Sequence, residues 1–92
     1  MEDSRLRQSH PEVVKRLRRA EGHLRAIVDM IESGRPCVDV AQQLHAVEKA
    51  VESAKRTLVH DHIDHCLDAA AKGNGRASRE SLAEFKAITK YL

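Results

Sequence analysis

The nine residues VHDHIDHCL, at positions 59–67, bring three histidines and one cysteine together in one short stretch. His62 and Cys66 are four residues apart, so on a helix they lie one turn apart on the same face and can reach the same metal ion. Cys37 is the other cysteine of the chain. Two thiolates and one imidazole form a soft donor set that favours copper(I) or zinc over magnesium or calcium. Three donors suit copper(I), whereas zinc would take a fourth.

The first element that the sequence predicts is a helix that begins near Ser9. Glu12 follows Ser9 at capping-box spacing, and Pro11 is tolerated in a first turn. The SGRP sequence at 33–36 ends this helix, because its glycine can adopt the left-handed conformation of a helix cap. Residues 1–8 are expected to form a flexible arm.

A second, very long helix is predicted from Cys37 to Lys72, a stretch that contains neither glycine nor proline. The KGNG sequence at 72–75 interrupts it, and a short third helix is expected from about Ser78. The chain of 92 residues is therefore expected to be a single all-α domain of three helices, with the longest in the centre.

Apolar residues form a regular seam along the predicted second helix. They alternate at steps of three and four: Cys37, Val40, Leu44, Val47, Val51, Ala54 and Leu58. About 35 residues make a helix of some 50 Å, whereas a compact chain of this length has a radius of gyration of about 12 Å. An apolar seam that extends so far needs a second chain to cover it. The sequence therefore predicts an obligate oligomer of paired long helices.

The three candidate metal ligands lie at opposite ends of this seam. Cys37 begins it, and His62 and Cys66 lie roughly 37–44 Å further along a continuous helix. One chain therefore cannot bring all three to one ion unless the helix breaks. In an antiparallel pair with a twofold axis near Ala50 or Val51, Cys37 of one chain would meet His62 and Cys66 of the other at two equivalent sites. Alternatively, both cysteines are small buried apolar residues.

Basic residues gather in the predicted first helix, although the net charge of the chain is only +2. The KRLRRAEGHLR sequence at 15–25 has five basic residues and one acidic residue. Such a face can bind the phosphates of a nucleic acid, or it is simply the solvated face of a helix.

Other classes of protein are disfavoured by the sequence. The apolar residues are periodic rather than continuous, so we expect no signal peptide, membrane span or membrane partner. This favours the cytoplasm, where two cysteines serve as ligands or redox sensors more often than as a structural disulfide. No nucleophile–base set or phosphate loop is present, so we expect neither an enzyme nor a small organic substrate.

With these features the chain resembles the CsoR/RcnR family of small all-α bacterial transcriptional repressors. The matching segments cover 16–51 and 58–66, and they include the R-x-x-G-H/Q, C-x-D-V-x-x-Q-L/I and H-x-x-x-C patterns of the family. The resemblance implies an antiparallel dimer of three-helix protomers that assembles into a disc-shaped dimer of dimers. It also implies binding of double-stranded operator DNA through basic faces, without a helix-turn-helix.

The resemblance also implies roles for individual residues. In the copper-responsive branch, the copper(I) ligands match Cys37, His62 and Cys66, and copper(I) releases the repressor from its operator. The basic residue that such repressors use for DNA matches Arg16, while a family arginine of the second helix aligns with Ser53. The expected DNA-binding residues are Lys15, Arg16, Arg18, Arg19, Lys49, Lys55 and Arg56.

Besides Ser53, the chain departs from the copper-responsive pattern at two places near the metal site. Pro36 replaces a tyrosine that often precedes the first cysteine. Ser81 replaces a third-helix glutamate of the outer network around the metal, for which Glu80 and Glu84 are the candidate substitutes.

The sequence therefore predicts a cytoplasmic, homotetrameric, copper(I)-responsive repressor. Three alternatives stay open: a sensor of nickel, cobalt or zinc, a thiol or persulfide sensor that uses Cys37 and Cys66, and a metal buffer that never binds DNA. A further donor, such as His65 or a residue of the N-terminal arm, could also join the metal site.

Overall fold

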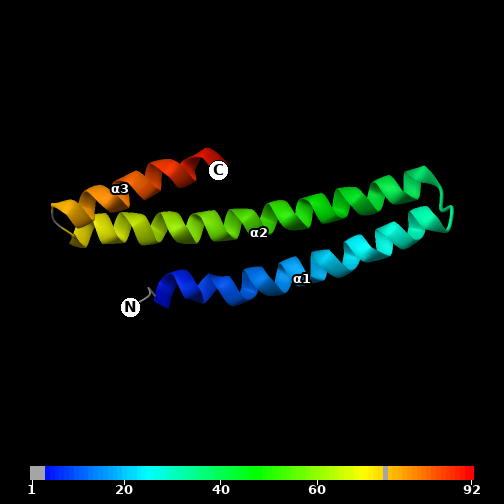
Figure 1. The fold of residues 1–92 in the computed structure, drawn as a ribbon, viewed down its shortest axis with the longest axis horizontal. Coiled ribbons are helices and arrows are strands. Elements are labelled where there is room, and N and C mark those ends of the chain that lie inside the picture. The colour runs from blue at the N-terminus through cyan, green and yellow to red at the C-terminus, as the bar shows by residue number, and fades with distance from the viewer. Residues whose placement is uncertain (1–3, 74) are drawn as a thin grey trace.

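Three antiparallel helices make up the protein. The computed structural model describes residues 4–73 and 75–92. These form α1 (Ser4–Glu32), α2 (Cys37–Lys72) and α3 (Arg76–Ile88), followed by a single 3-10 turn, η1 (Thr89–Tyr91). Helix α2 lies in the middle, with α1 along one side and α3 along the other (Figure 1). The predicted all-α class, the three helices and the long central helix are confirmed.

The molecule is long and thin. Its dimensions are 60 × 23 × 13 Å and its radius of gyration is 18.1 Å, well above the roughly 12 Å of a compact chain of this length. The shortest dimension is close to the diameter of about 10–12 Å of one helix with its side chains. The chain is therefore a single layer of helices. None of the described helices combines the length and the apolar character that crossing a membrane requires.

A tight turn sets the antiparallel course of α1 and α2. Gly34 has a φ of 79°, and the amide of Arg35 donates to the carbonyl of Met30 at 2.9 Å. These are features of a helix end closed by a left-handed glycine, as the sequence predicted. Pro36 then precedes α2 as its N-cap, and the amide of Val40 donates to its carbonyl at 3.2 Å.

The start of α1 corrects the sequence analysis. We predicted a helix start at Ser9, but α1 begins at Ser4 and contains Pro11 in its interior. Proline there removes one backbone hydrogen bond without ending the helix, and the residues before Ser9 (RLRQ) are good helix formers. The Ser9 hydroxyl does not cap α1, because it donates to Asp61 on α2. Of the arm expected at 1–8, residues 4–8 belong to α1, and residues 1–3 lie outside the described part of the chain.

The core between α1 and α2 consists of two rows of buried residues at intervals of seven. Val13, Ala20 and Ile27 form the row on α1. Val40, Val47 and Ala54 form the row on α2. Their side chains are short, so the two helices approach closely along most of their length. Cys66 is buried further along α2, beside α3.

The predicted seam of α2 is therefore divided into two halves. One half, the row of Val40, Val47 and Ala54, packs against α1 within the chain. In the other half, Leu44 and Val51 are 45% and 40% exposed. They lie on the same side of the protomer as Leu17 and Leu24 of α1, which are both 44% exposed; a groove of about 350 Å³ includes Leu17, Leu24 and Val51 in its lining. We call these four residues the apolar face.

Candidate metal centre and nucleic-acid interface

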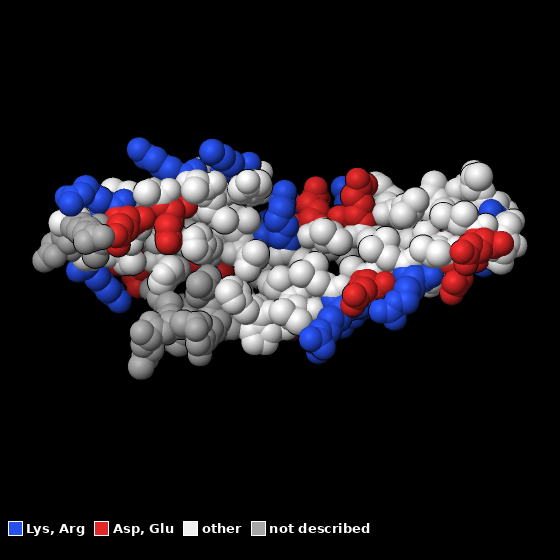
Figure 2. Space-filling view, viewed as in Figure 1, with Lys and Arg blue, Asp and Glu red and all other residues white. Residues whose placement is uncertain are grey.

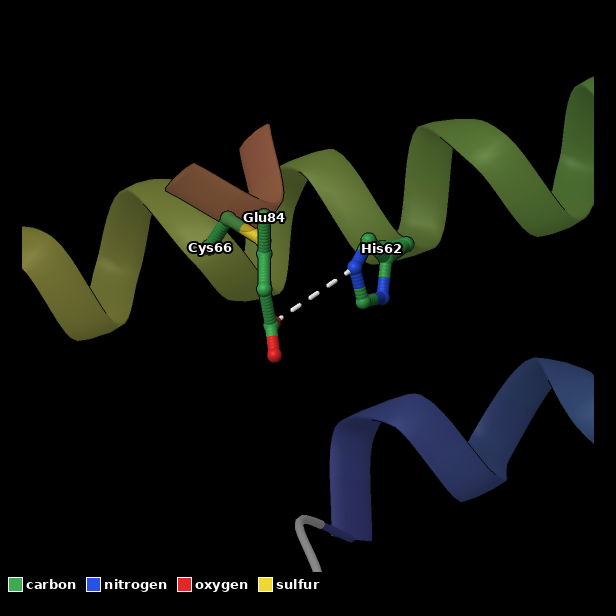
Figure 3. Close-up of side chains that lie close together, drawn as sticks. All are labelled: His62, Cys66 and Glu84. Atoms are coloured by element: carbon green, nitrogen blue, oxygen red, sulfur yellow. Dashed lines mark hydrogen bonds and ion pairs between the residues drawn. The ribbon is translucent and has the colours of Figure 1, made fainter. Parts of the chain in front are cut away.

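Three potential metal donors meet where α3 packs on α2. His62 and Cys66 come from adjoining turns of α2, and Glu84 reaches over them from α3 (Figure 3). Their donor atoms all lie within 4.8 Å of one another. The distance from Glu84 Oε2 to His62 Nε2 is 3.7 Å, and that to Cys66 Sγ, which donates to the same oxygen, is 3.9 Å. The predicted pair of His62 and Cys66 therefore faces a common point.

The three side chains differ in how far they are exposed. Cys66 is only 1% exposed, whereas the side chains of His62 and Glu84 are 23% and 62% exposed. The cluster is thus a surface site with a buried thiol at its base. A thiolate and an imidazole fit copper(I) or zinc, and the carboxylate adds an oxygen donor that borderline divalent ions accept.

The environment of Cys66 keeps its thiol protonated. Burial raises the pKa of this thiol above its ordinary value, and the negative charge of Glu84 and the hydrogen bond to that carboxylate raise it further. A metal ion binds the thiolate rather than the thiol. Metal binding at Cys66 near neutral pH must therefore displace a proton.

Replacement of Glu84 with glutamine is expected to lower the pKa of the Cys66 thiol. The change removes the negative charge that opposes the thiolate, while the effect of burial stays. The thiolate should then form at a lower pH than in the parent protein. Ultraviolet absorbance of the thiolate during a pH titration measures this, in a Cys37→Ser background that leaves Cys66 as the reporter. Glu80→Gln on the same helix is the matched control, and an equal effect of both changes would contradict the assignment to Glu84.

The structure selects one of the two glutamates that the sequence offered. Glu84, and not Glu80, lies at the cluster. It is one helical turn beyond Ser81, so it projects from the same face of α3 as the position where the resemblance places a glutamate. The spacing of the sequence offered Glu80 and Glu84 as substitutes for the glutamate expected at Ser81. Only the packing of α3 on α2 identifies Glu84 as the one beside His62 and Cys66.

Cys37 lies outside this cluster. It is exposed at the first turn of α2, and α2 continues without interruption to Lys72. The separation along the helix is therefore roughly 37–44 Å, and the single chain does not bring Cys37 to His62 and Cys66. Among the other histidines, His60 is exposed, and the ring of His65 is centred 6.2 Å from that of His62.

The basic residues of α1 divide between two sides of the helix. Arg16 and Arg19 line a groove of about 440 Å³ between α1 and α2, whose other lining residues include His23 and the small side chains of Ala50 and Ser53. We call it the basic groove. At its acidic edge Arg16 Nε contacts Glu12 Oε2 at 3.2 Å. Figure 2 shows Lys and Arg side chains along α1 and also around α3, at the other end of the molecule.

The remaining basic residues of the sequence prediction lie elsewhere. Lys15 and Arg18 line a separate pocket on α1. Lys55 and Arg56 line a cleft beside Tyr91, where Arg56 pairs with Glu52 at 3.6 Å. Lys49 is exposed on α2. The seven predicted residues therefore form several patches in one protomer, and only Arg16 and Arg19 share the basic groove.

Fold and site together define a small helical protein with a thiol, an imidazole and a carboxylate close enough to hold one metal ion, and with a groove lined in part by arginines. Residues 9–91 match the family of metal-sensitive transcriptional repressors, and the chain belongs to this family. It is accordingly a metal-sensing repressor that binds operator DNA, and it is not an enzyme.

Several relatives carry named functions. The copper-sensing transcriptional repressor CsoR of Mycobacterium ulcerans (strain Agy99) is 40% identical over 80 residues, which cover 86% of this chain and 68% of the relative. CsoR of Bacillus subtilis (strain 168) is 41% identical over 81 residues, which cover 86% of this chain and 80% of the relative. Among solved structures, the nickel-responsive transcriptional regulator InrS superposes with a TM-score of 0.77 at 34% identity, over 89% of this chain and 91% of that one.

Proposed function

We propose that copper(I) is the effector of this repressor and that it releases the protein from operator DNA. The observation that carries the proposal is the buried Cys66 thiol beside His62 on adjoining turns of α2. A sulfur and a nitrogen at this spacing supply two of the three soft donors that copper(I) takes in trigonal coordination. Copper-sensing relatives at about 40% identity support the same metal.

The third donor in this proposal is Cys37 of a second copy. In the single chain the apolar face is exposed, with its residues Leu17, Leu24, Leu44 and Val51. An antiparallel pair of protomers would bury this face. It would also bring the exposed Cys37 at one end of α2 toward His62 and Cys66 at the other end of the partner. A homotetramer built from two such dimers would carry four copper sites and several basic grooves on one assembly.

Operator DNA is proposed to contact the basic groove of α1 and the neighbouring Lys and Arg side chains. Arg16 and Arg19 project into the groove, and the small side chains of Ala50 and Ser53 leave it open. Contacts of this kind are made mainly with phosphates, so operator affinity should fall steeply with salt. Because a transcriptional repressor must reach its operator DNA, we place the protein in the cytoplasm.

Replacement of Arg16 with alanine is expected to weaken operator binding by roughly tenfold or more and to reduce the salt dependence by about one phosphate contact per copy. Copper(I) affinity should stay unchanged, because Arg16 is on α1 and does not contribute to the donor cluster. Fluorescence anisotropy on labelled operator at several salt concentrations measures both effects. Arg35→Ala, at the turn between α1 and α2, is the matched control; an Arg16→Ala variant that lost copper binding would refute this division of roles.

A second candidate effector is nickel(II) or another borderline divalent ion. Glu84 brings a carboxylate oxygen to the cluster, and imidazole and carboxylate donors suit such ions better than they suit copper(I). The structural likeness to nickel-responsive InrS supports this alternative.

The experiment that tests the proposal is an anaerobic titration of the reduced, operator-bound protein with copper(I), nickel(II) and zinc(II). Release by copper(I) at the lowest free concentration, with two sulfurs and one nitrogen in the X-ray absorption spectrum, would support copper sensing through Cys37, His62 and Cys66. Release by nickel(II), with one sulfur or none in the first shell, would establish the second candidate. Release by persulfide but by no metal would indicate a thiol sensor, and failure to bind the operator at all would indicate a metal buffer.

A further inference from the structure

One hydrogen bond connects the start of the basic helix to the turn of α2 that carries the metal donors. The hydroxyl of Ser9 on α1 donates to Asp61 Oδ2 on α2 at 2.8 Å, across 52 positions of sequence. Both side chains are half-buried, so solvent competes with this bond less than it would at an exposed site.

Asp61 is the residue immediately before His62. From the other side of α2, Glu84 of α3 contacts His62 at 3.7 Å. The turn of α2 that contains Asp61 and His62 is therefore joined to both of the other helices, by the Ser9–Asp61 hydrogen bond to α1 and by the His62–Glu84 contact to α3. A displacement of this turn must change at least one of the two contacts, because an O–H···O bond tolerates only about 2.5–3.0 Å.

Helix α1 can carry such a displacement to the DNA-binding residues. It runs without interruption from Ser4 to Glu32, and Arg16 follows Ser9 by about 10 Å along it. The first core residue after Ser9 is Val13, which is 6% exposed. Less than two turns of helix therefore separate Ser9 from Arg16 in the basic groove, so a movement at Ser9 can reach it.

We propose that the Ser9–Asp61 hydrogen bond couples metal binding to operator release, with Ser9 and Asp61 as positioning residues. The inference rests on the proposed function of the cluster. The bond is made in the operator-binding form and is lost when a metal ion draws His62 and Cys66 into its coordination shell. Metal binding then frees the start of α1, and the basic groove loses its fit to the operator phosphates.

The size of the effect matches what one bond can supply. Coupling between an effector and a second ligand typically changes affinity by about 5- to 150-fold. A hydrogen bond to a charged group shifts an equilibrium by roughly tenfold or more. A single bond of this kind can therefore account for a large part of a metal response.

Replacement of Ser9 with alanine is the test, because it removes the bond without changing the charge near the metal donors. Loss of the bond destabilises the operator-binding form relative to the metal-binding form. The apo-protein should bind the operator more weakly and copper(I) more tightly, by two factors whose product is about tenfold or more. The ratio of operator affinities without and with metal should fall by the same factor as the operator affinity of the apo-protein. A side chain with a merely structural role would not strengthen metal binding.

Ser9→Thr is the matched control, since threonine keeps the hydroxyl but is a poorer helix former than alanine. Ser9→Thr should retain the metal response of the parent protein. If helix propensity were the cause, Ser9→Thr would depart from the parent protein more than Ser9→Ala does. Asp61→Ala combined with Ser9→Ala should be no worse than Asp61→Ala alone. Anaerobic copper(I) competition and operator anisotropy on the full chain give all the required affinities.

The outcomes separate this inference from the function on which it rests. A parent protein that copper(I) releases normally, together with a Ser9→Ala variant unchanged in both affinities, would overturn the inference alone. Weaker binding of both copper(I) and operator in Ser9→Ala would overturn it too, because that pattern indicates general damage. A parent protein whose operator binding ignores every metal would refute the proposed function, and the inference with it.

Discussion

Replacement of His62 with alanine is expected to weaken copper(I) binding by more than about 100-fold. Loss of an outer-shell partner costs a metal site up to about 100-fold in affinity, and loss of a direct ligand should cost more. His62 supplies the nitrogen donor of the proposed site, and the ring lies within 4.8 Å of the other donor atoms. The apo-protein should still bind its operator, because α1 and the basic groove are untouched. Copper(I) should then fail to release it. An anaerobic competition titration and an operator-release assay on the same preparation measure the two properties.

His60→Ala is the matched control for this experiment. His60 lies two residues before His62 in the same histidine-rich stretch, but it is exposed and belongs to the cleft beside Tyr91 rather than to the donor cluster. It should retain the copper(I) affinity of the parent protein. Equal losses in the His60 and His62 variants would show that this stretch holds metal nonspecifically, and a normal response of His62→Ala would exclude His62 as a ligand.

Replacement of Val51 with aspartate is expected to abolish assembly. Val51 is 40% exposed and belongs to the apolar face, where it lines the same groove as Leu17 and Leu24. In an antiparallel pair with its axis near this residue, the two new carboxylates would face each other in an apolar contact, where unpaired charges are very costly. Sedimentation should show a monomer or an unfolded chain. Copper(I) affinity should fall as well, because each site would lose the cysteine of the second copy.

Val38→Asp provides the comparison, since Val38 is also on α2 but is 67% exposed and lies outside the apolar face and its groove. That variant should sediment like the parent protein. A Val51→Asp variant with the mass of the parent would mean that the subunits pair through another surface. The more conservative Val51→Ala should shift the association equilibrium without unfolding the protomer, which separates loss of assembly from loss of fold.

Features that depend on local sequence were predictable. The absence of glycine and proline from 37–72 predicted α2 as the structure shows it. The SGRP turn predicted the end of α1, because glycine adopts a positive φ without strain. The pairing of His62 with Cys66 followed from helical spacing alone. In each case the responsible interactions lie within a few residues of one another, so the pattern carries the information.

Features that depend on tertiary contacts were not predictable in the same way. The periodicity of the α2 seam identified apolar positions, but it could not tell that Val40, Val47 and Ala54 pack on α1 while Leu44 and Val51 stay exposed. Ser9 matched a capping pattern, yet its partner is 52 residues away. Glu84 was one of two candidates until the packing of α3 on α2 placed it beside His62.

The shortest dimension of the protomer, 13 Å, has a consequence for how much repressor a cell can hold. A layer one helix thick stabilises itself with few side chains, and those of its central core are mostly valine and alanine. In the proposed assembly, a newly synthesised chain is therefore a good substrate for proteases until it meets another copy. At low expression, the abundance of assembled repressor then depends on the square of the concentration of newly synthesised chains. A metal ion that bridges two copies lengthens their lifetime, so exposure to metal would raise the stock of repressor available when the metal is gone.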